Sequence, residues 1–201
     1  MNTESYLTVQ QSAVLELTIE RSRFIGHCQE ATTETDAKEF ISQIRTSHSQ
    51  ATHNCYAYRI GTNTPHLEYY HDHGEPNGTA GKPILGGIQR LALTNVVIVV
   101  TRYFGGKKLG VRGLIEAYGQ IATLVLEQAG TILRIPKLFA TLSCNYSNYD
   151  HLLYRLKQLE AEIIESIFTD KITLILTIPS AKKQALLNLI EEFPQLNLEI
   201  S

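Results

Sequence analysis

Positively charged side chains gather in one part of the sequence that contains no carboxylate. Between Glu75 and Glu116 there is no aspartate or glutamate, although the formal net charge of the whole chain is −2. The cations of this interval are Lys82, Arg90, Arg102, Lys107, Lys108 and Arg112. A pI of about 6.4 therefore conceals one basic stretch. Clustered Lys and Arg side chains of this kind attract phosphate groups, including those of RNA.

The glycines of the segment VVTRYFGGKKLGVRG, residues 99–113, admit two interpretations. Gly105, Gly106 and Gly110 either supply the positive φ of a tight turn or let a phosphate approach bare backbone. A helix starting near residue 110 would add unpaired N–H groups and about half a positive charge. Tyr103 and Phe104 either pack in the core or offer surfaces on which bases stack. The predicted anion- or nucleic-acid-binding residues are Lys82, Arg102, Tyr103, Lys107, Lys108 and Arg112.

A second candidate site lies in the segment YHDHGEP, residues 70–76. His71, Asp72, His73 and Glu75 bring two imidazoles and two carboxylates within five residues, which is enough donors for a divalent metal if the loop folds back. The alternative is that Asp72 and Glu75 make capping and turn hydrogen bonds. We therefore treat Asp72, His73 and Glu75 as a loop or ligand site and predict no metal centre.

A third pair, His53 and Cys55, lies on one face of a predicted strand and suggests a thiol–imidazole nucleophile. Side chains at alternate strand positions lie about 7 Å apart, which is too far for a direct hydrogen bond. A half-buried histidine beside a core cysteine is the favoured interpretation.

Common enzyme signatures are missing from the sequence. Gly81-Lys82 resembles the end of a phosphate-binding P-loop, but Pro76 and Pro83 occupy the positions that need glycine and Ser or Thr. G-x-S-x-G and H-E-x-x-H do not occur. We predict no cofactor and no catalytic residue, and whether the protein is an enzyme stays open, with a non-catalytic role favoured.

Composition indicates a folded protein of the cytoplasm. With 43% hydrophobic and 19% charged residues, the chain can bury a substantial core. The start, MNTESYLTVQ, has no leader pattern, and no apolar run is long enough to span a membrane. Three cysteines without C-x-x-C spacing favour buried reduced thiols. Together with the missing leader pattern and the short apolar runs, they lead us to expect cytoplasmic localisation and no membrane contact.

Residues 1–136 are predicted to form the larger domain, with a boundary near Ile135-Pro136. A helix capped by Asp36 follows two strands, and a second helix starts near Lys82-Pro83. The segment from Thr94 to Tyr103 is so uniformly apolar that it predicts a central strand covered on both faces. The remaining predicted strands are residues 13–19, 23–29, 55–60 and 67–70, and a last helix ends before Gly130.

Residues 137–201 predict a smaller domain. A strand over 138–144 precedes a helix capped at Ser147, whose apolar face carries Leu152, Leu153, Leu156 and Leu159. Two strands, a helix opened by Pro179-Ser180 and a strand over 196–200 complete the pattern. This order, β-α-β-β-α-β, is ferredoxin-like.

Four motifs together make the chain similar to the IMPACT or YigZ-like family. They are RSRFIGH (Arg21 to His27), ATHNCYAYR (Ala51 to Arg59), DHGEPNGTAGKPIL (Asp72 to Leu85) and VVTRYFGGKKLGVRGLIEAYG (Val99 to Gly119). The resemblance implies an α/β (α+β) protein with an N-terminal domain of the ribosomal-protein S5 domain 2-like fold, including a left-handed β-α-β crossover. It also implies a ferredoxin-like C-terminal domain similar to a terminal domain of the translocating elongation factor.

The resemblance brings no settled activity, but it implies RNA or ribosome-related binding and a link to translation regulation. Eukaryotic members restrain a starvation-response kinase and carry an additional N-terminal domain. Only about a dozen residues precede the first predicted strand here, so that kinase role is not expected. Two positions depart from the family pattern: His73 replaces the second aspartate of D-D-G-E-P, and Arg112 replaces a glycine of L-G-x-G-G-L.

Three functions are therefore open. The favoured one is a cytoplasmic binding protein whose basic stretch contacts RNA or the ribosome. The second is an enzyme that acts on a small phosphorylated or metal-bound substrate beside Asp72, His73 and Glu75. The third is a protein-interaction module that binds a partner through the C-terminal domain.

Overall fold

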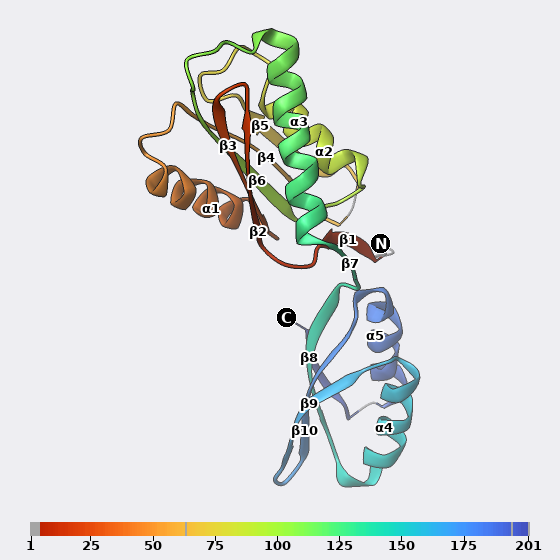
Figure 1. Ribbon diagram of the computed structural model, residues 1–201. Helices are drawn as coiled ribbons and strands as arrows, with labels where there is room; N and C mark the ends of the chain where they lie inside the picture. Colours follow the sequence, from red (N-terminus) through yellow and green to blue (C-terminus); the bar gives the residue numbers. More distant parts are fainter. Residues whose placement is uncertain (1–4, 63, 194, 201) are drawn as a thin grey trace. The chain divides into compact units, whose positions relative to one another are not determined.

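The chain divides into two units between Arg134 and Ile135. The structure is a computed structural model that describes residues 5–62, 64–193 and 195–200 (Figure 1). The larger unit is Tyr6–Arg134, and the smaller one continues from Ile135. The prediction that residues 1–10 carry no leader pattern falls partly outside the described residues, because residues 1–4 are not among them.

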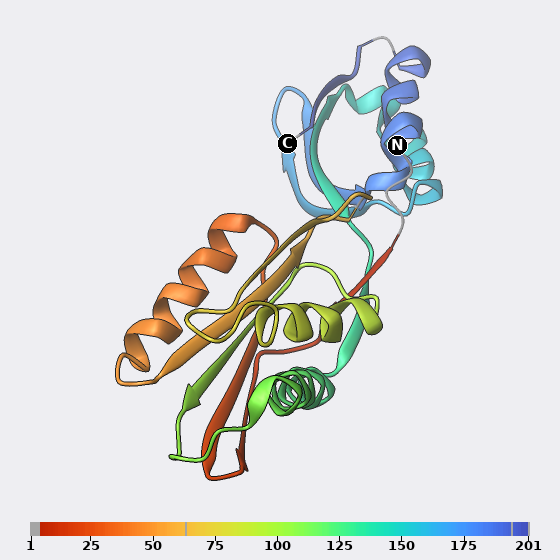
Figure 2. The same ribbon diagram turned by 90° about the horizontal axis from the view of Figure 1, so that it is seen from above.

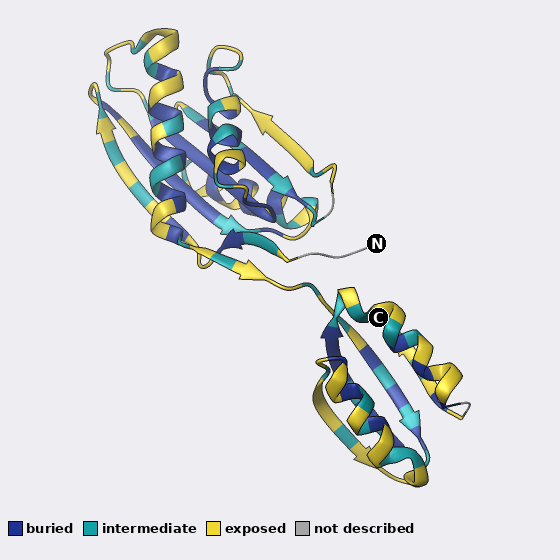
Figure 3. Ribbon diagram, turned by 90° about the vertical axis from the view of Figure 1, so that its right-hand side faces the viewer, coloured by how far each residue is buried: buried dark blue, intermediate teal, exposed yellow. Residues whose placement is uncertain are grey.

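The larger unit is built on a five-stranded antiparallel sheet in the order β2-β3-β6-β4-β5. The strands are β2 (Ala13–Ile19), β3 (Ser22–Glu30), β4 (His53–Ile60), β5 (Leu67–His71) and β6 (Val96–Tyr103). The apolar segment before Tyr103 is indeed the central strand, because Val97 and Val99 pack in one core and Val96, Ile98 and Val100 in another. At the margin, β5 is exposed along its whole length (Figure 3).

Helices cover both faces of this sheet. Helix α1 (Glu34–Ser47) lies on one face, while α2 (Gly81–Arg90) and α3 (Gly110–Ala129) pack on the other (Figure 2). The predicted cap of α1 is corrected by three residues. Thr33 is the N-cap, and Asp36 occupies the third helical position of a capping box, since the Asp36 amide donates to Thr33 Oγ1 at 3.1 Å.

A short two-stranded sheet closes the larger unit and was not predicted. In it β1 (Tyr6–Val9) pairs antiparallel with β7 (Thr131–Arg134). Gly130 ends α3 as predicted, with a φ of 69° that an L side chain rarely adopts.

The smaller unit has the predicted β-α-β-β-α-β order, in which α4 and α5 cover one face of the sheet (Figure 1). Its antiparallel sheet has the order β11-β8-β10-β9, so the first and third strands of the unit are central. The elements are β8 (Lys137–Cys144), α4 (Tyr149–Gln158), β9 (Glu162–Phe168), β10 (Ile172–Pro179), α5 (Lys183–Glu192) and β11 (Asn197–Ile200).

Two helix starts in the smaller unit differ from the prediction. Ser147 is not the cap of α4, because a 3-10 turn, Tyr146–Asn148, comes first and Asn148 is the N-cap without a side-chain hydrogen bond. A second 3-10 turn, Ser180–Lys182, precedes α5. Among the described residues, no helix has both the length and the apolarity needed to cross a bilayer.

Candidate functional site

Arg102, one of the predicted anion-binding cations, is buried in an ion pair with Glu75. Its Nη1 atom lies 2.6 Å from Glu75 Oε1, and the two side chains are only 5% and 4% exposed. Nη2 donates to Ser22 Oγ at 3.1 Å, and the Tyr118 hydroxyl donates to the same Glu75 oxygen at 2.9 Å. The prediction that Arg102 is an anion-binding cation is therefore corrected: its side chain lies inside the fold, and its charge is compensated by Glu75.

Aromatic rings enclose this ion pair. The guanidinium carbon of Arg102 lies 5.4 Å from the ring centroids of both Phe24 and Phe104. Phe24 in turn meets Tyr118 edge to face, with ring centroids 5.4 Å apart. These contacts exclude water and strengthen the attraction between the two charges. The sequence signals neither Tyr118 nor Ser22 as a partner, because both come from distant elements.

His53 and Cys55 turn to different partners. Cys55 Sγ lies 2.8 Å from the carbonyl oxygen of Asp72 and 3.4 Å from the Tyr118 hydroxyl. Burial raises the pKa of the Cys55 thiol to about 12, which keeps it protonated at neutral pH. His53 Nδ1 instead lies 2.9 Å from the carbonyl oxygen of His73. The arrangement is the half-buried histidine beside a core cysteine that the sequence favoured, and burial of the Cys55 thiol opposes its ionisation.

The acidic loop that precedes α2 serves the start of that helix. Asp72 Oδ1 accepts from the amides of Ala80 and Gly81 at 3.0 and 2.8 Å, and Oδ2 accepts from the Gly78 amide at 2.8 Å. The N-terminus of α2, which carries the predicted anion-binding residue Lys82, is thus already occupied by a carboxylate of the same chain.

The other donors of this loop also have internal partners. His73 Nδ1 accepts from the Asn54 amide at 3.1 Å, and Glu75 is held by Arg102. Among the described residues, no three His, Cys, Asp or Glu side chains are placed to hold a metal ion together. The capping interpretation therefore accounts for Asp72, while Glu75 belongs to the buried pair.

The start of α3 presents exposed cations and no internal anion in its first turn. Its N-cap, Leu109, makes no side-chain hydrogen bond, and the first turn contains no acidic residue. Lys107 and Lys108 line a hollow of about 410 Å³ together with Gly113 and Glu116. We call Lys107, Lys108 and Arg112 the α3 basic surface.

Two cations of the α3 basic surface have exposed acidic partners. Lys107 Nζ pairs with Glu20, and Arg112 Nε lies 2.8 Å from Glu116 Oε1 with the Arg112 side chain 93% exposed. Exposed ion pairs of this kind are worth about 0–1 kcal/mol. They can exchange their partners, whereas the buried pair cannot do so without stranding a charge.

The glycines of this loop have structural reasons of their own. A Cβ on Gly105 would lie 1.8 Å from the carbonyl oxygen of Arg21, so only glycine fits there. Gly106 and Gly110 have φ values of 84° and 74° with open space beside them. Tight backbone geometry therefore explains the glycines, and the case for an anion depends on the cations.

The remaining predicted residues lie elsewhere. Lys82 is exposed in the first turn of α2. Its neighbour Pro83 lies beside Gly119, where a Cβ would be 3.9 Å from Pro83 Cβ, and Gly119 is about 14 Å along α3 from its start. Tyr103 is half-buried; its hydroxyl lies 2.9 Å from His48 Nδ1, and Arg23 covers its ring. Arg90 reaches Thr123 near the other end of α2. No described contact joins Lys82 or Arg90 to the α3 basic surface.

Fold and site together define a two-unit α/β protein with a buried ion-pair centre and an exposed basic helix start. The sequence model of the Impact N-terminal domain matches residues 20–126, and that of a domain of unknown function, DUF1949, matches residues 142–193. The chain belongs to the IMPACT family.

Curated relatives and a solved structure agree with this assignment. The chain is 43% identical over 164 residues to the IMPACT family member YvyE of Bacillus subtilis, covering 82% of this chain and 72% of the relative. It is 33% identical to YigZ of Escherichia coli over 180 residues, 89% of this chain and 88% of that protein. A crystal structure described as a hypothetical protein covers 98% of this chain and 96% of its own, with 31% identity and a TM-score of 0.70.

Proposed function

We propose that this IMPACT-family protein is a cytoplasmic, non-catalytic RNA-binding protein with a role in translation regulation. The observation that carries the proposal is the α3 basic surface, where exposed cations surround a helix start without an internal carboxylate. Phosphate oxygens accept from such N–H groups and from Lys and Arg together. The ligand is RNA, free or within the ribosome, and the link to translation comes from the family resemblance.

Exposure decides which cations take part. Lys107 and Arg112 exchange Glu20 and Glu116 for phosphate at small cost, because solvent screens both surface pairs. Lys108 adds a third exposed charge beside them. Arg102 takes no part, since Glu75 holds it inside the fold.

An enzyme that acts beside Asp72, His73 and Glu75 gains no support from the geometry. Asp72 caps α2, His73 Nδ1 accepts a hydrogen bond from the Asn54 amide, and Glu75 pairs with Arg102. A general acid or base must reach the reacting group of a substrate, and each of these side chains is already directed at a neighbour within the fold.

Fluorescence anisotropy with a labelled single-stranded RNA of about 15 nucleotides tests the proposal. We expect Lys107→Ala with Lys108→Ala to weaken binding roughly tenfold at moderate salt, because two phosphate contacts are lost. Lys157→Ala with Lys171→Ala removes the same charge from the smaller unit and is the matched control. Equal affinities of both double variants and the unaltered protein would show that the α3 basic surface does not bind RNA.

A second candidate function is supported by β9 in the smaller unit. This strand lies at the edge of its sheet and exposes Ile163, Ile164, Ile167 and Phe168. Exposed apolar edge strands pair with a strand of another protein. Crosslinking in cells followed by mass spectrometry should place protein partners on β9 and lose them in Ile167→Lys. Protein crosslinks confined to residues 6–134 would contradict this role.

A further inference from the structure

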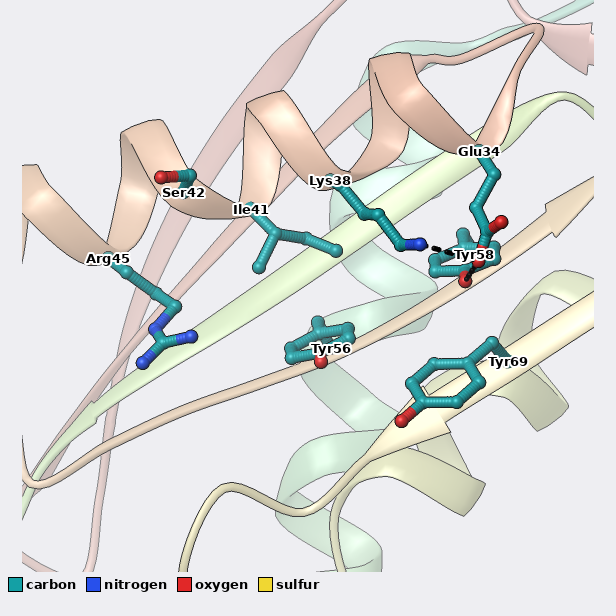
Figure 4. Close-up of a pocket in the computed structure, with 8 residues that line it drawn as sticks. All are labelled: Glu34, Lys38, Ile41, Ser42, Arg45, Tyr56, Tyr58 and Tyr69. Carbon is teal, nitrogen blue, oxygen red and sulfur yellow. Dashed lines mark hydrogen bonds and ion pairs between the residues drawn. The ribbon is translucent and has the colours of Figure 1, made fainter.

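A groove between α1 and the strands β4 and β5 is lined by aromatic rings on one side and by charged side chains on the other (Figure 4). Its volume is about 360 Å³. Tyr56, Tyr58 and Tyr69 come from the strands, and Lys38 and Arg45 face them from the helix. A second hollow of about 680 Å³ shares Arg45 and extends to His73. The groove lies on the face of the sheet opposite to α3, so it is distinct from the α3 basic surface.

The three tyrosine rings of this groove, together with His71 beside them, form a continuous row across the two strands. The register pairs Tyr58 with Tyr69 and Tyr56 with His71. Ring centroids lie 5.5 Å apart for Tyr58–Tyr69, 6.2 Å for Tyr56–Tyr69 and 5.4 Å for Tyr56–His71, with interplanar angles of 16–23°. Near-parallel rings at alternate positions of neighbouring strands form a platform rather than an isolated pair.

The outer part of the row is open to solvent. Tyr58 is buried, and its hydroxyl donates to Glu34 at 2.7 Å, but Tyr69 is 45% exposed and His71 is also exposed. Cross-strand aromatic pairs stabilise a sheet whether or not a ligand is present. The aromatic row alone therefore does not indicate a ligand. Arg45, on the other side of the groove, gives the second indication.

Arg45 directs an uncompensated positive charge at the row. Among the described residues it has no ion-pair partner, whereas Lys38, about two helical turns earlier, pairs with Glu34 at 3.0 Å. Burial raises the pKa of Tyr56, and the Arg45 charge opposes that rise, as expected for a cation near the ring. A flat ring and an unpaired cation across one hollow match a ligand that carries both an aromatic base and a phosphate.

We propose that this groove binds unpaired nucleotides of single-stranded RNA, with a base stacked on Tyr69 or His71 and a phosphate contacted by Arg45. The assignment rests on the proposed RNA-binding function and adds a second contact surface to it. Strand-borne aromatic residues commonly stack two or three bases of single-stranded RNA. Duplex RNA cannot enter in this way, because its bases are stacked within the helix.

A single-stranded RNA of 12 nucleotides with 2-aminopurine near its centre tests the groove, since stacking on tyrosine quenches that base and the chain contains no tryptophan. We expect Tyr69→Leu to abolish the quenching and to weaken binding about tenfold. Tyr69→Phe should restore both, because the ring rather than the hydroxyl carries the contact. Arg45→Gln should make the salt dependence shallower by about 0.7 in slope.

Tyr70→Leu is the matched control, because Tyr70 is the next residue of β5, points to the opposite face and is also exposed. It should leave both quenching and affinity unchanged. RNA binding that depends on Lys107 and Lys108 but is indifferent to Tyr69→Leu would overturn the groove and leave the proposed function standing. Adenosine monophosphate that binds as tightly as the oligonucleotide would overturn the assignment to RNA. If the unaltered protein did not bind RNA at all, the proposed function itself would be refuted.

Discussion

Arg102 and Lys107 lie five residues apart in the same acid-free stretch, yet their environments are opposite. Arg102 is within β6, the central strand, where its side chain is directed into the fold toward Glu75 and Tyr118. Lys107 follows the end of that strand and is exposed beside Glu20. The comparison teaches that a cluster of cations along a sequence can be treated as a candidate binding surface only after the cations that the fold buries, such as Arg102, have been excluded.

Removing Glu75 should have the largest effect on this comparison. Glu75→Ala leaves the buried Arg102 charge without a carboxylate to compensate it, so we expect a loss of about 3–5 kcal/mol in the free energy of unfolding. Chemical denaturation followed by circular dichroism measures it. Combining Glu75→Leu with Arg102→Met should recover much of the loss, because no buried charge remains. A single variant as stable as the unaltered protein would mean that water reaches the pair.

His27 extends the comparison to a buried imidazole on the other face of the sheet. Burial, aided by the charge of His48, lowers the pKa of His27 from 6.5 to about 4. The unfolded chain therefore binds a proton first as the pH falls, and stability is lost between about pH 6.5 and 4. From pH 7.5 to 5.0 we expect His27 to contribute a loss of about 2 kcal/mol. His27→Gln should reduce the measured pH dependence by that amount, and an unchanged dependence would contradict the assignment.

Substitution of Asp72 should have an intermediate effect on stability, because its carboxylate accepts hydrogen bonds from the amides at the start of α2. Asp72→Ala deprives the amides of Ala80 and Gly81 of their acceptor, so we expect a loss of about 1–2 kcal/mol. Thermal denaturation by calorimetry checks this value. Asp72→Asn keeps one acceptor oxygen and should lose less. If Asp72→Ala were neutral for stability but abolished a measured catalytic activity, the carboxylate would belong to an active site instead.

The smallest change in stability is expected at the exposed ion pairs. Glu20→Ala and Glu116→Ala should each alter the free energy of unfolding by less than about 0.5 kcal/mol. Each should also tighten RNA binding a few-fold, because Lys107 or Arg112 no longer has a competing carboxylate. Anisotropy titrations with the same labelled RNA measure this gain, and weaker binding in both variants would place the two carboxylates, rather than Lys107 and Arg112, in contact with the ligand.

Much of the fold was predictable because periodicity records burial. The strand predicted over Thr94 to Tyr103 was confirmed as the central strand, although it starts at Val96, and the smaller unit with its alternating and 3.6-residue patterns was confirmed. The β1–β7 pair was not predictable, because each strand has four residues and they are more than 120 positions apart. The caps of α1 and α4 were misplaced since several Ser, Thr, Asp and Asn residues compete near each start.

The site was only partly predictable, because its contacts join distant segments. Arg102 and Glu75 are 27 residues apart, and their pairing depends on the position of the loop after β5. The aromatic row required the register of β4 with β5, although the alternating YAY of Tyr56 and Tyr58 indicates that both rings share one face. Charge patterning found the α3 basic surface but gave no sign that Arg102 was not part of it.

The salt dependence of RNA binding tests the α3 basic surface most directly. Three cations of that surface and Arg45 together predict a slope of log K against log salt of about −3 for single-stranded RNA, at about −0.7 for each contact. Lys107→Ala with Lys108→Ala should reduce its magnitude by about 1.4. An identical slope in the double variant and the unaltered protein would contradict the proposal that these exposed lysines hold phosphate.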